Sequence, residues 1–376
     1  MTRTRRTLLG LSAACVAILL GAYLATPATA EITDPRVAEA QAAVQAYCTD
    51  LRDDATTTRQ SNARADLCAM WKRELADRTE PSPAPTQSPT ASPTASPTTS
   101  PTASPSPTAS PSPVRACPAG VPTETAYAEC TGTPKGTVLR DCPTRLTTAG
   151  AIYDGCRFVG QVDILASNVT IRNSLVLGRV DTGDGGQQTG ARIEDTTIDG
   201  TNWNASYNFS CVGFNDYTLL RVRAFGCGYG ANANGNNVIV DSWLYGWRHV
   251  GDKPHQDAVI SNGARHVVVS HSLLDCANST DCSAALGLFG DFEPIYDFLI
   301  TGNRFETGGG YCVYGGSDDN KPYPDASSVW FLNNVFGRKY SSRCGYAGPV
   351  RDFEVLRGNV WDNNTWVDGG IVAASV

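Results

Sequence analysis

The amino-acid sequence predicts an all-β solenoid with parallel strands for residues 114–376, on three observations. Short β-branched runs recur eight times, about 26 residues apart, a period that fits one solenoid coil and is too short for a strand plus a long helix. A polar turn containing Asn, Asp, Ser or Gly follows each run. No regular Asn-Gly hairpin spacing occurs, so the strands are expected to be parallel. The runs begin at Val169, Arg192, Leu219, Val238, Val267, Phe298, Val329 and Val355.

Stacked coils are expected to share one apolar interior, because a single turn of chain cannot bury its own apolar face. Asn or Ser side chains just after each run are expected to stack as well and to bond the backbone at the corner. A second strand is expected about ten residues before most runs, at 211–214, 229–231, 255–260, 285–289, 311–314 and 346–348. The interior column predicted from the runs consists of Ile171, Ile193, Leu220, Val240, Val269, Ile300, Phe331 and Leu356.

Three segments of different character precede the solenoid. Residues 1–30 have the basic start, apolar run and small-x-small site of a signal peptide, with an uncleaved membrane anchor as the alternative. Residues 31–80 predict a small helical hairpin, whose limited apolar surface calls for a Cys48–Cys68 disulfide across it. Residues 81–113 are a low-complexity Pro/Ser/Thr-rich linker, which is expected to form an extended, semi-rigid stalk.

The cysteines predict a disulfide framework. Of the 13 cysteines one lies in the export segment, which leaves the even number that complete pairing requires. No C-x-x-C pair is present, so disulfides are favoured over zinc or redox sites and the compartment is expected to be oxidising. The expected bridges are Cys211–Cys227 and Cys312–Cys344 between adjacent coils and Cys276–Cys282 within a loop, while Cys117, Cys130, Cys142 and Cys156 allow three pairings.

The repeats resemble a known superfamily. The eight runs, the Asn-Val-Thr-Ile-Arg-Asn-Ser phrase at 168–174 and the His-Gln-Asp-Ala-Val phrase at 255–259 are similar to secreted right-handed parallel β-helix proteins of the pectate-lyase-like superfamily. The resemblance covers about residues 117–376 and implies right-handed coils and a carbohydrate partner, neither of which the period alone reveals. That superfamily includes polysaccharide lyases, glycoside hydrolases, epimerases and adhesins, so the resemblance is specific for fold and not for activity.

The charge composition limits the classes of binding partner that can be expected. The net charge is −7 and the chain has only five lysines, without any basic tract. Nucleic acid is therefore not expected as a partner, since phosphate contacts need clustered Lys and Arg. The resemblance to β-helix proteins implies an extracellular polysaccharide as the partner. We expect it to be bound by a monomer that is secreted or held at the cell surface by a membrane or cell-wall tether.

The densest group of chemically useful side chains lies at 245–257, with two imidazoles, two carboxylates and two cations. His255 and Asp257 are two residues apart on a predicted strand, so they are expected on one face as a proton-transfer pair. Asp252 would lie beside them. The alternative is that these side chains only bond loop backbone.

Acidic side chains follow the next coil. Asp291 and Glu293 are expected near the same edge, where paired carboxylates can serve hydrolysis. The same oxygens can instead hold Ca²⁺, or they can be solvated turn residues; no cofactor is certain and no metal ligands are assigned.

Aromatic and cationic side chains in the same coils predict a surface for sugars, whose C–H faces pack on rings and whose hydroxyls bond polar groups. The predicted substrate-binding residues are Tyr245, Trp247, Arg248, Lys253, Tyr311, Tyr314, Arg338 and Tyr340.

The functional prediction is an extracellular carbohydrate-active protein, a polysaccharide lyase or glycoside hydrolase in which His255 and Asp257 perform acid–base chemistry. The rival hypothesis is a non-catalytic glycan-binding or surface-display protein, which the stalk and the anchor-like N-terminus favour.

Overall fold

The computed structural model describes residues 115–183, 188–203, 209–245, 255–277 and 281–374. The predicted signal peptide, helical hairpin with Cys48–Cys68, and linker lie outside the described residues. So do four of the predicted site residues, Trp247, Arg248, Asp252 and Lys253.

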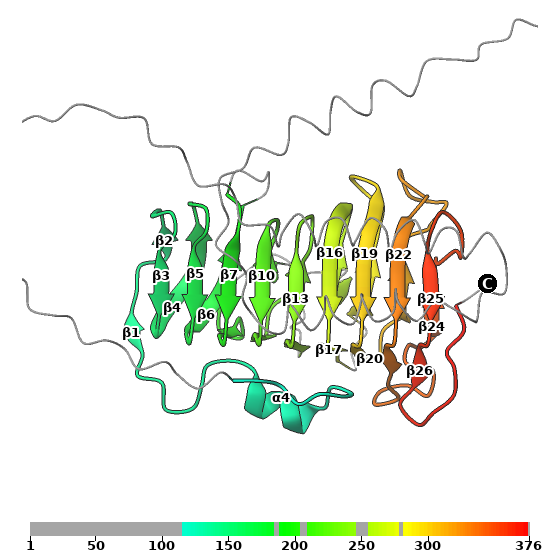
Figure 1. Ribbon diagram of the computed structural model, residues 1–376, viewed down its shortest axis with the longest axis horizontal. Helices are drawn as coiled ribbons and strands as arrows, with labels where there is room; N and C mark the ends of the chain where they lie inside the picture. Colours follow the sequence, from blue (N-terminus) through cyan, green and yellow to red (C-terminus); the bar gives the residue numbers. More distant parts are fainter. Residues whose placement is uncertain (1–114, 184–187, 204–208, 246–254, 278–280, 375–376) are drawn as a thin grey trace, which may run out of the picture. The chain divides into compact units, whose positions relative to one another are not determined.

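The described chain is a parallel β-helix in which each complete coil contributes three strands (Figure 1). Wall 1 is a nine-stranded parallel sheet. Its strands are β3 (Ile152–Asp154), β5 (Thr170–Arg172), β7 (Ala191–Glu194), β10 (Tyr217–Leu220), β13 (Val238–Val240), β16 (Ala264–Ser270), β19 (Ile295–Thr301), β22 (Ser327–Leu332) and β25 (Val360–Asp362).

Walls 2 and 3 belong to one 17-stranded sheet, which is continuous because β6 (Leu175–Asp181) pairs with a strand of each wall and with β4 (Cys156–Ile164). Two short strands, β1 (Arg140–Asp141) and β2 (Arg145–Leu146), pair with β4 at the first coil. Wall 2 contains β8 (Thr197–Asp199), β11 (Arg223–Phe225), β14 (Trp243–Tyr245), β17 (Leu273–Cys276), β20 (Arg304–Thr307), β23 (Val335–Phe336) and β26 (Thr365–Trp366). Wall 3 contains β9 (Ser210–Gly213), β12 (Tyr229–Asn232), β15 (Gln256–Ser261), β18 (Cys282–Leu288), β21 (Tyr311–Gly315) and β24 (Gly348–Arg351).

The interior column of wall 1 is confirmed in five positions and corrected in three. Leu219 and Ile239 face the core where Leu220 and Val240 were predicted, because successive side chains of a strand point to opposite faces. Leu356 is 59% exposed and lies before the last coil. The column consists of Ile171, Ile193, Leu219, Ile239, Val269, Ile300, Phe331 and Trp361.

Wall 3 is the second strand column that the sequence predicted, with one adjustment. Val212, Ala231, Val259, Leu286, Val313 and Val350 are aligned across it. The last strand begins at Gly348 and not at Tyr346, whose side chain is exposed.

A polar ladder runs along the corner after wall 1, as the Asn and Ser spacing predicted. The backbone N–H of Asn303 donates to Asn334 Oδ1 at 3.0 Å, and that of Asn334 donates to Asn364 Oδ1 at 3.1 Å. The side-chain amide of Asn334 also donates to the Ile300 carbonyl at 2.9 Å. Each buried amide thereby satisfies backbone groups that the bend would leave unpaired. The fully buried members are Ser174, Thr196, Ser242, Ser272, Asn303, Asn334 and Asn364.

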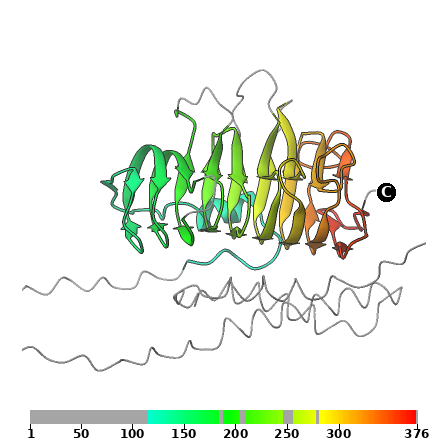
Figure 2. The ribbon, with the colours of Figure 1, turned by 90° about the horizontal axis from the view of Figure 1, so that it is seen from above.

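Residues 115–137, here called the arm, lie along wall 2 and carry the one helix of the described residues, α4 (Glu124–Cys130) (Figures 1 and 2). The sequence interpretation missed α4, although Thr123 is an N-cap residue whose Oγ1 accepts from the Ala126 N–H. Cys117 and Tyr127 of the arm form a buried apolar cluster with Trp243 and Leu273 of wall 2.

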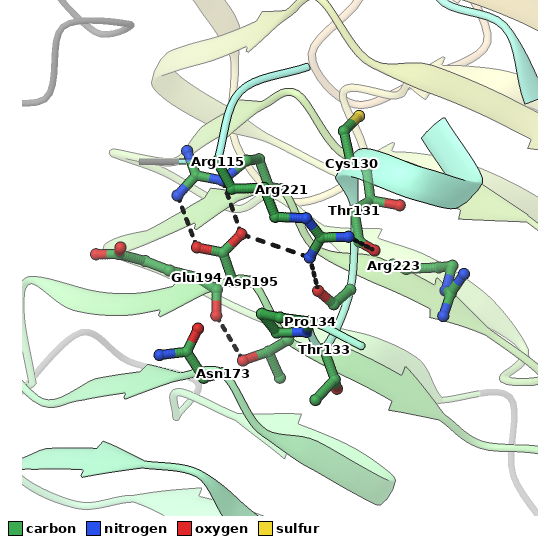
Figure 3. Close-up of polar contacts among 12 residues, drawn as sticks. Arg115, Cys130, Thr131, Thr133, Pro134, Asn173, Glu194, Asp195, Arg221 and Arg223 are labelled. Atoms are coloured by element: carbon green, nitrogen blue, oxygen red, sulfur yellow. Dashed lines mark hydrogen bonds and ion pairs between the residues drawn. The ribbon is translucent and has the colours of Figure 1, made fainter. Parts of the chain in front are cut away.

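Polar contacts hold the arm as well (Figure 3). Arg115 lies 3.9 Å from Asp195, which also receives two hydrogen bonds from Arg221. Thr133 Oγ1 donates to the Ser174 carbonyl at the far end of the arm. The arm therefore occupies much of the outer face of wall 2.

Five disulfides connect the described cysteines. Cys211–Cys227, Cys276–Cys282 and Cys312–Cys344 are confirmed, and the open set resolves into Cys117–Cys130 and Cys142–Cys156. This many disulfides is typical of an extracellular or otherwise oxidising environment. Within the described part of the chain, no helix has the length and apolar character needed to cross a bilayer.

Candidate functional site

The outer face of wall 3 is shaped by an irregularity that repeats from coil to coil. In each of four strands two consecutive residues belong to the core, for example Ala258 and Val259 of β15. The residues on either side of such a pair therefore both face outwards, which departs from simple alternation. Asp257 is one of these outward residues. A Cβ added to Gly287 would lie 3.1 Å from Asp257 Oδ1 and would also meet the Phe289 ring, so the Asp257 carboxyl group and this ring lie on the same side of the strand as that Cβ. The four pairs are Cys211/Val212, Ala258/Val259, Ala285/Leu286 and Cys312/Val313.

Asp257 is fully buried, and neither of its carboxyl oxygens has a hydrogen-bond partner. Burial raises the pKa of Asp257 well above its ordinary value, because the charged form loses its hydration. The Ala284 backbone N–H opposes this rise. Burial thus favours the protonated form of this carboxyl group.

Aromatic side chains surround this acid. The Phe289 ring lies over Gly287 and 5.3 Å from the Tyr314 ring, which in turn lies 5.5 Å from Tyr311. Burial, together with the nearby Asp257, raises the pKa of Tyr229 and of Tyr314 to about 12, so both phenols remain neutral. The Asp257 patch, as we call it, consists of Tyr229, Asp257, Phe289, Tyr311 and Tyr314.

His255 does not contact Asp257 in this structure. The ring of His255 is exposed, and its Nδ1 lies 3.4 Å from Ser283 Oγ. The pairing of β15 with β18 shifts between Gln256 and Asp257, so the residues on the two sides of this shift do not follow one regular strand. The predicted proton-transfer pair is therefore not formed here, and the acid–base roles of both residues stay predictions.

The acids of the next coil differ in their surroundings. Asp291 forms an ion pair with Lys321 at 2.8 Å, and the Lys321 ammonium lies 5.1 Å from the centre of the Phe289 ring. Asp291 is thereby linked to the edge of the Asp257 patch, whereas Glu293 is exposed. Among the described residues no group of three or more His, Cys, Asp or Glu is arranged to hold a metal ion.

Three predicted substrate-binding residues lie away from the patch. Tyr245, on wall 2, stacks on Trp243 at 4.1 Å and packs against the apolar cluster of the arm. Arg338 is paired with Asp368 and lies over Trp366 at 4.0 Å. Tyr340 belongs to a separate polar cluster. Of the described candidates, Tyr311 and Tyr314 alone share the surroundings of Asp257.

That polar cluster was not anticipated from the sequence. Asp275 and Glu306 occupy the same position of consecutive coils on wall 2, and Lys339 Nζ lies 2.7 Å from Asp275 and 2.6 Å from Glu124 of α4. Tyr340 donates to Asp275 at 3.3 Å. Burial raises the pKa of Asp275, and the bond from Lys339 opposes the rise. Because Lys339 joins the wall to α4, we assign this cluster to attachment of the arm.

Comparison of the chain with protein-family models, with curated protein sequences and with solved structures finds no match. The class that fold and bridges define is a disulfide-bonded parallel β-helix protein.

Proposed function

We propose that this protein is a carbohydrate-active protein that acts on an extracellular polysaccharide, with the Asp257 patch as the point of contact. The observation that carries the proposal is a buried carboxyl group, with a raised pKa and neither oxygen hydrogen-bonded, among aromatic side chains. Perturbed acids of this kind cluster at functional sites. The five disulfides support the extracellular setting, and secretion or tethering through residues 1–113 belongs to the same proposal.

The chemistry follows from the two parts of the patch. The rings of Phe289, Tyr311 and Tyr314 offer apolar faces for the C–H faces of sugars. A carboxylic acid with a raised pKa can give its proton to the leaving glycosidic oxygen as the glycosidic C–O bond breaks and water adds to the sugar carbon, as in general acid catalysis. The pKa of Asp257 is shifted in the direction that this role requires.

Wall 3 is the more suitable surface for a long ligand. Wall 2 is occupied by the arm, whose Tyr127 and Cys117 are buried against it. On wall 3 Tyr229 stands on β12, and Tyr311 and Tyr314 both stand on β21, so rings occur on separate coils along the axis. A polymer running along the axis would meet them in succession.

The test incubates the full chain with a panel of polysaccharides and follows both unsaturated-uronate absorbance and new reducing ends. Asp257→Asn keeps the shape and removes the proton, so we expect a loss of turnover of about a hundredfold or more with glycan binding retained. Asp318→Asn, which neutralises a partly exposed carboxylate just after β21, is the matched control. Full activity in Asp257→Asn would refute the acid role.

The second candidate function is glycan binding without reaction. The aromatic part of the patch favours it, because rings bind sugars whether or not a proton is transferred. Binding without any new reducing ends or unsaturated products, lost in Tyr314→Ala and kept in Asp257→Asn, would establish this alternative.

A further inference from the structure

Arg179, on β6, is a buried cation with an unused edge. Only 2% of its side chain is exposed, and its Nη1 lies 3.0 Å from Asp181 Oδ2. Its Nε and Nη2 have no hydrogen-bond partner and are both buried. In a planar guanidinium these two nitrogens share one edge, where their N–H bonds point the same way.

The faces of this guanidinium are covered, so the free edge is the part that remains for a ligand. The Arg179 guanidinium carbon lies 4.8 Å from the centre of the Phe209 ring, and the rings of Trp203 and Phe214 lie at 6.0 and 5.9 Å. Burial lowers the pKa of Arg179, while Asp181 and Asp163 oppose this. The ordinary pKa of an arginine side chain is so high that Arg179 stays charged despite this lowering.

Other unpaired polar atoms belong to residues that surround Gly213, next to Arg179. A Cβ on Gly213 would lie 2.8 Å from Ser210 Oγ and 3.8 Å from Arg179 Nη2, so both groups lie close to this glycine, where a larger residue would meet Ser210. Ser210 Oγ and Asn232 Oδ1 are buried and have no partner either. An unpaired buried polar atom costs about 1–3 kcal/mol, and two of these atoms, Ser210 Oγ and Arg179 Nη2, lie beside the same glycine.

The same molecule shows what this edge binds elsewhere. The buried Arg221 donates from Nε and Nη2 to the two carboxylate oxygens of Asp195, at 2.8 and 2.7 Å (Figure 3). Arg304 donates from the same two nitrogens to Glu306 at 2.9 and 2.6 Å. Both edges are filled by carboxylates, and the corresponding edge of Arg179 is empty.

We propose that Arg179, with Ser210, binds a carboxylate group of a ligand outside this chain. A planar anion with two oxygens matches the two parallel N–H bonds. The nearby Asp163 and Asp181 disfavour an anion that carries two charges, so phosphate and sulfate fit less well. The site lies on β6 and β9 and does not depend on the proposed role of Asp257.

A carboxylate can come from an acidic sugar or from an acidic peptide, and the experiment separates them. Calorimetric titration of the full chain would use glucuronate, glucose as its uncharged counterpart, a blocked aspartyl peptide and inorganic phosphate. We expect glucuronate or the peptide to bind at least about tenfold more tightly than glucose and phosphate, which is the worth of one charge-assisted pair.

Two variants test the residues. Arg179→Lys keeps the charge and removes the fork, so carboxylate affinity should fall about tenfold to a hundredfold. Ser210→Ala removes one hydroxyl and should weaken carboxylate binding a few-fold. This second variant still tests the site if Arg179→Lys does not fold. Arg221→Lys, whose edge is already filled by Asp195, is the matched control and should bind as the parent does.

The outcomes are distinct. Preference for glucuronate assigns an acidic sugar, and preference for the peptide assigns an acidic protein segment; both support the carboxylate site. Equal binding of glucose, equal binding of phosphate, no binding at all, or unchanged affinity in both Arg179→Lys and Ser210→Ala would overturn it. Because these readouts measure binding of a small acid and not turnover, they fail or succeed separately from the Asp257 proposal.

Discussion

Asp257→Asn should make the protein more stable at neutral pH, and by an amount that grows with pH. The folded state holds Asp257 buried, with its pKa raised well above the ordinary 3.8. In the folded state the group therefore keeps its proton over a pH range in which the unfolded chain has lost it. Stability from this residue is fully present below about pH 4 and is lost as the pH rises towards the folded pKa.

The magnitude follows from proton linkage. Between the pKa of Asp257 in the unfolded chain and its pKa in the folded protein, each pH unit lowers the free energy of unfolding by about 1.4 kcal/mol. The reason is that the folded state binds one proton that the unfolded state has released. Asparagine does not titrate and has nearly the same shape. The difference between variant and parent should therefore increase by about 1.4 kcal/mol per pH unit above pH 4, until the folded pKa is reached.

Urea unfolding of both full-length proteins at several pH values between about 4 and 7 measures this difference directly. Asp318→Asn is the control with the opposite sign, since the backbone N–H of Asn320 lowers the pKa of Asp318. The stability that Asp318 contributes is present above its ordinary pKa of 3.8 and lost as the pH falls below it. A pH-independent difference for Asp257→Asn would refute the conclusion that its carboxyl is desolvated.

Three further predictions concern the scaffold. Asn334→Ala should lower the free energy of unfolding by about 2–5 kcal/mol, since two buried backbone groups lose their partners, whereas the exposed Asn363→Ala should change it by less than about 0.5 kcal/mol; urea unfolding compares them. Replacing both cysteines of Cys312–Cys344 with serine should cost about 4 kcal/mol, against about 2 kcal/mol for Cys276–Cys282, because the loops span 32 and 6 residues; equal losses would contradict a loop-entropy origin. Lys339→Met should speed amide hydrogen exchange in α4 by removing the bridge to wall 2, and unchanged exchange would show that the apolar contacts suffice.

The stacking of coils was predictable because it rests on a local repeat. A β-branched run such as 169–171 or 329–331 predicts a strand by itself. The polar residue that follows the run, such as Asn334, predicts the corner of the coil. Pairing of Cys211 with Cys227 followed from the same period, since it joins equivalent points of adjacent coils. The four cysteines before the repeats offered no such register, and their pairing emerged only in three dimensions.

The direction of individual side chains was less predictable. Leu220 and Val240 were placed inside because each stands in an apolar run, yet a shift of one residue reverses the face. His255 and Asp257 were expected on the same face of the strand because simple alternation of side chains was assumed. A local shift in the pairing of β15 with β18 interrupts that alternation. The position of α4 against wall 2 depends on contacts between residues more than a hundred positions apart, such as Tyr127 with His271.

The sequence by itself predicted stacked parallel coils and a disulfide framework, since period, turn chemistry and cysteine spacing are properties of neighbouring residues. The structure shows these coils from β1 onwards, and the arm that precedes them lies along wall 2. Only the tertiary structure decided which polar groups lost their water. Side chains from several coils bury Asp257 and raise its pKa, and Nε and Nη2 of Arg179 are buried without a hydrogen-bond partner beside Ser210 and Gly213. A charged group is buried by neighbours that come from distant parts of the chain. A single stretch of sequence therefore does not show how far the group is removed from water.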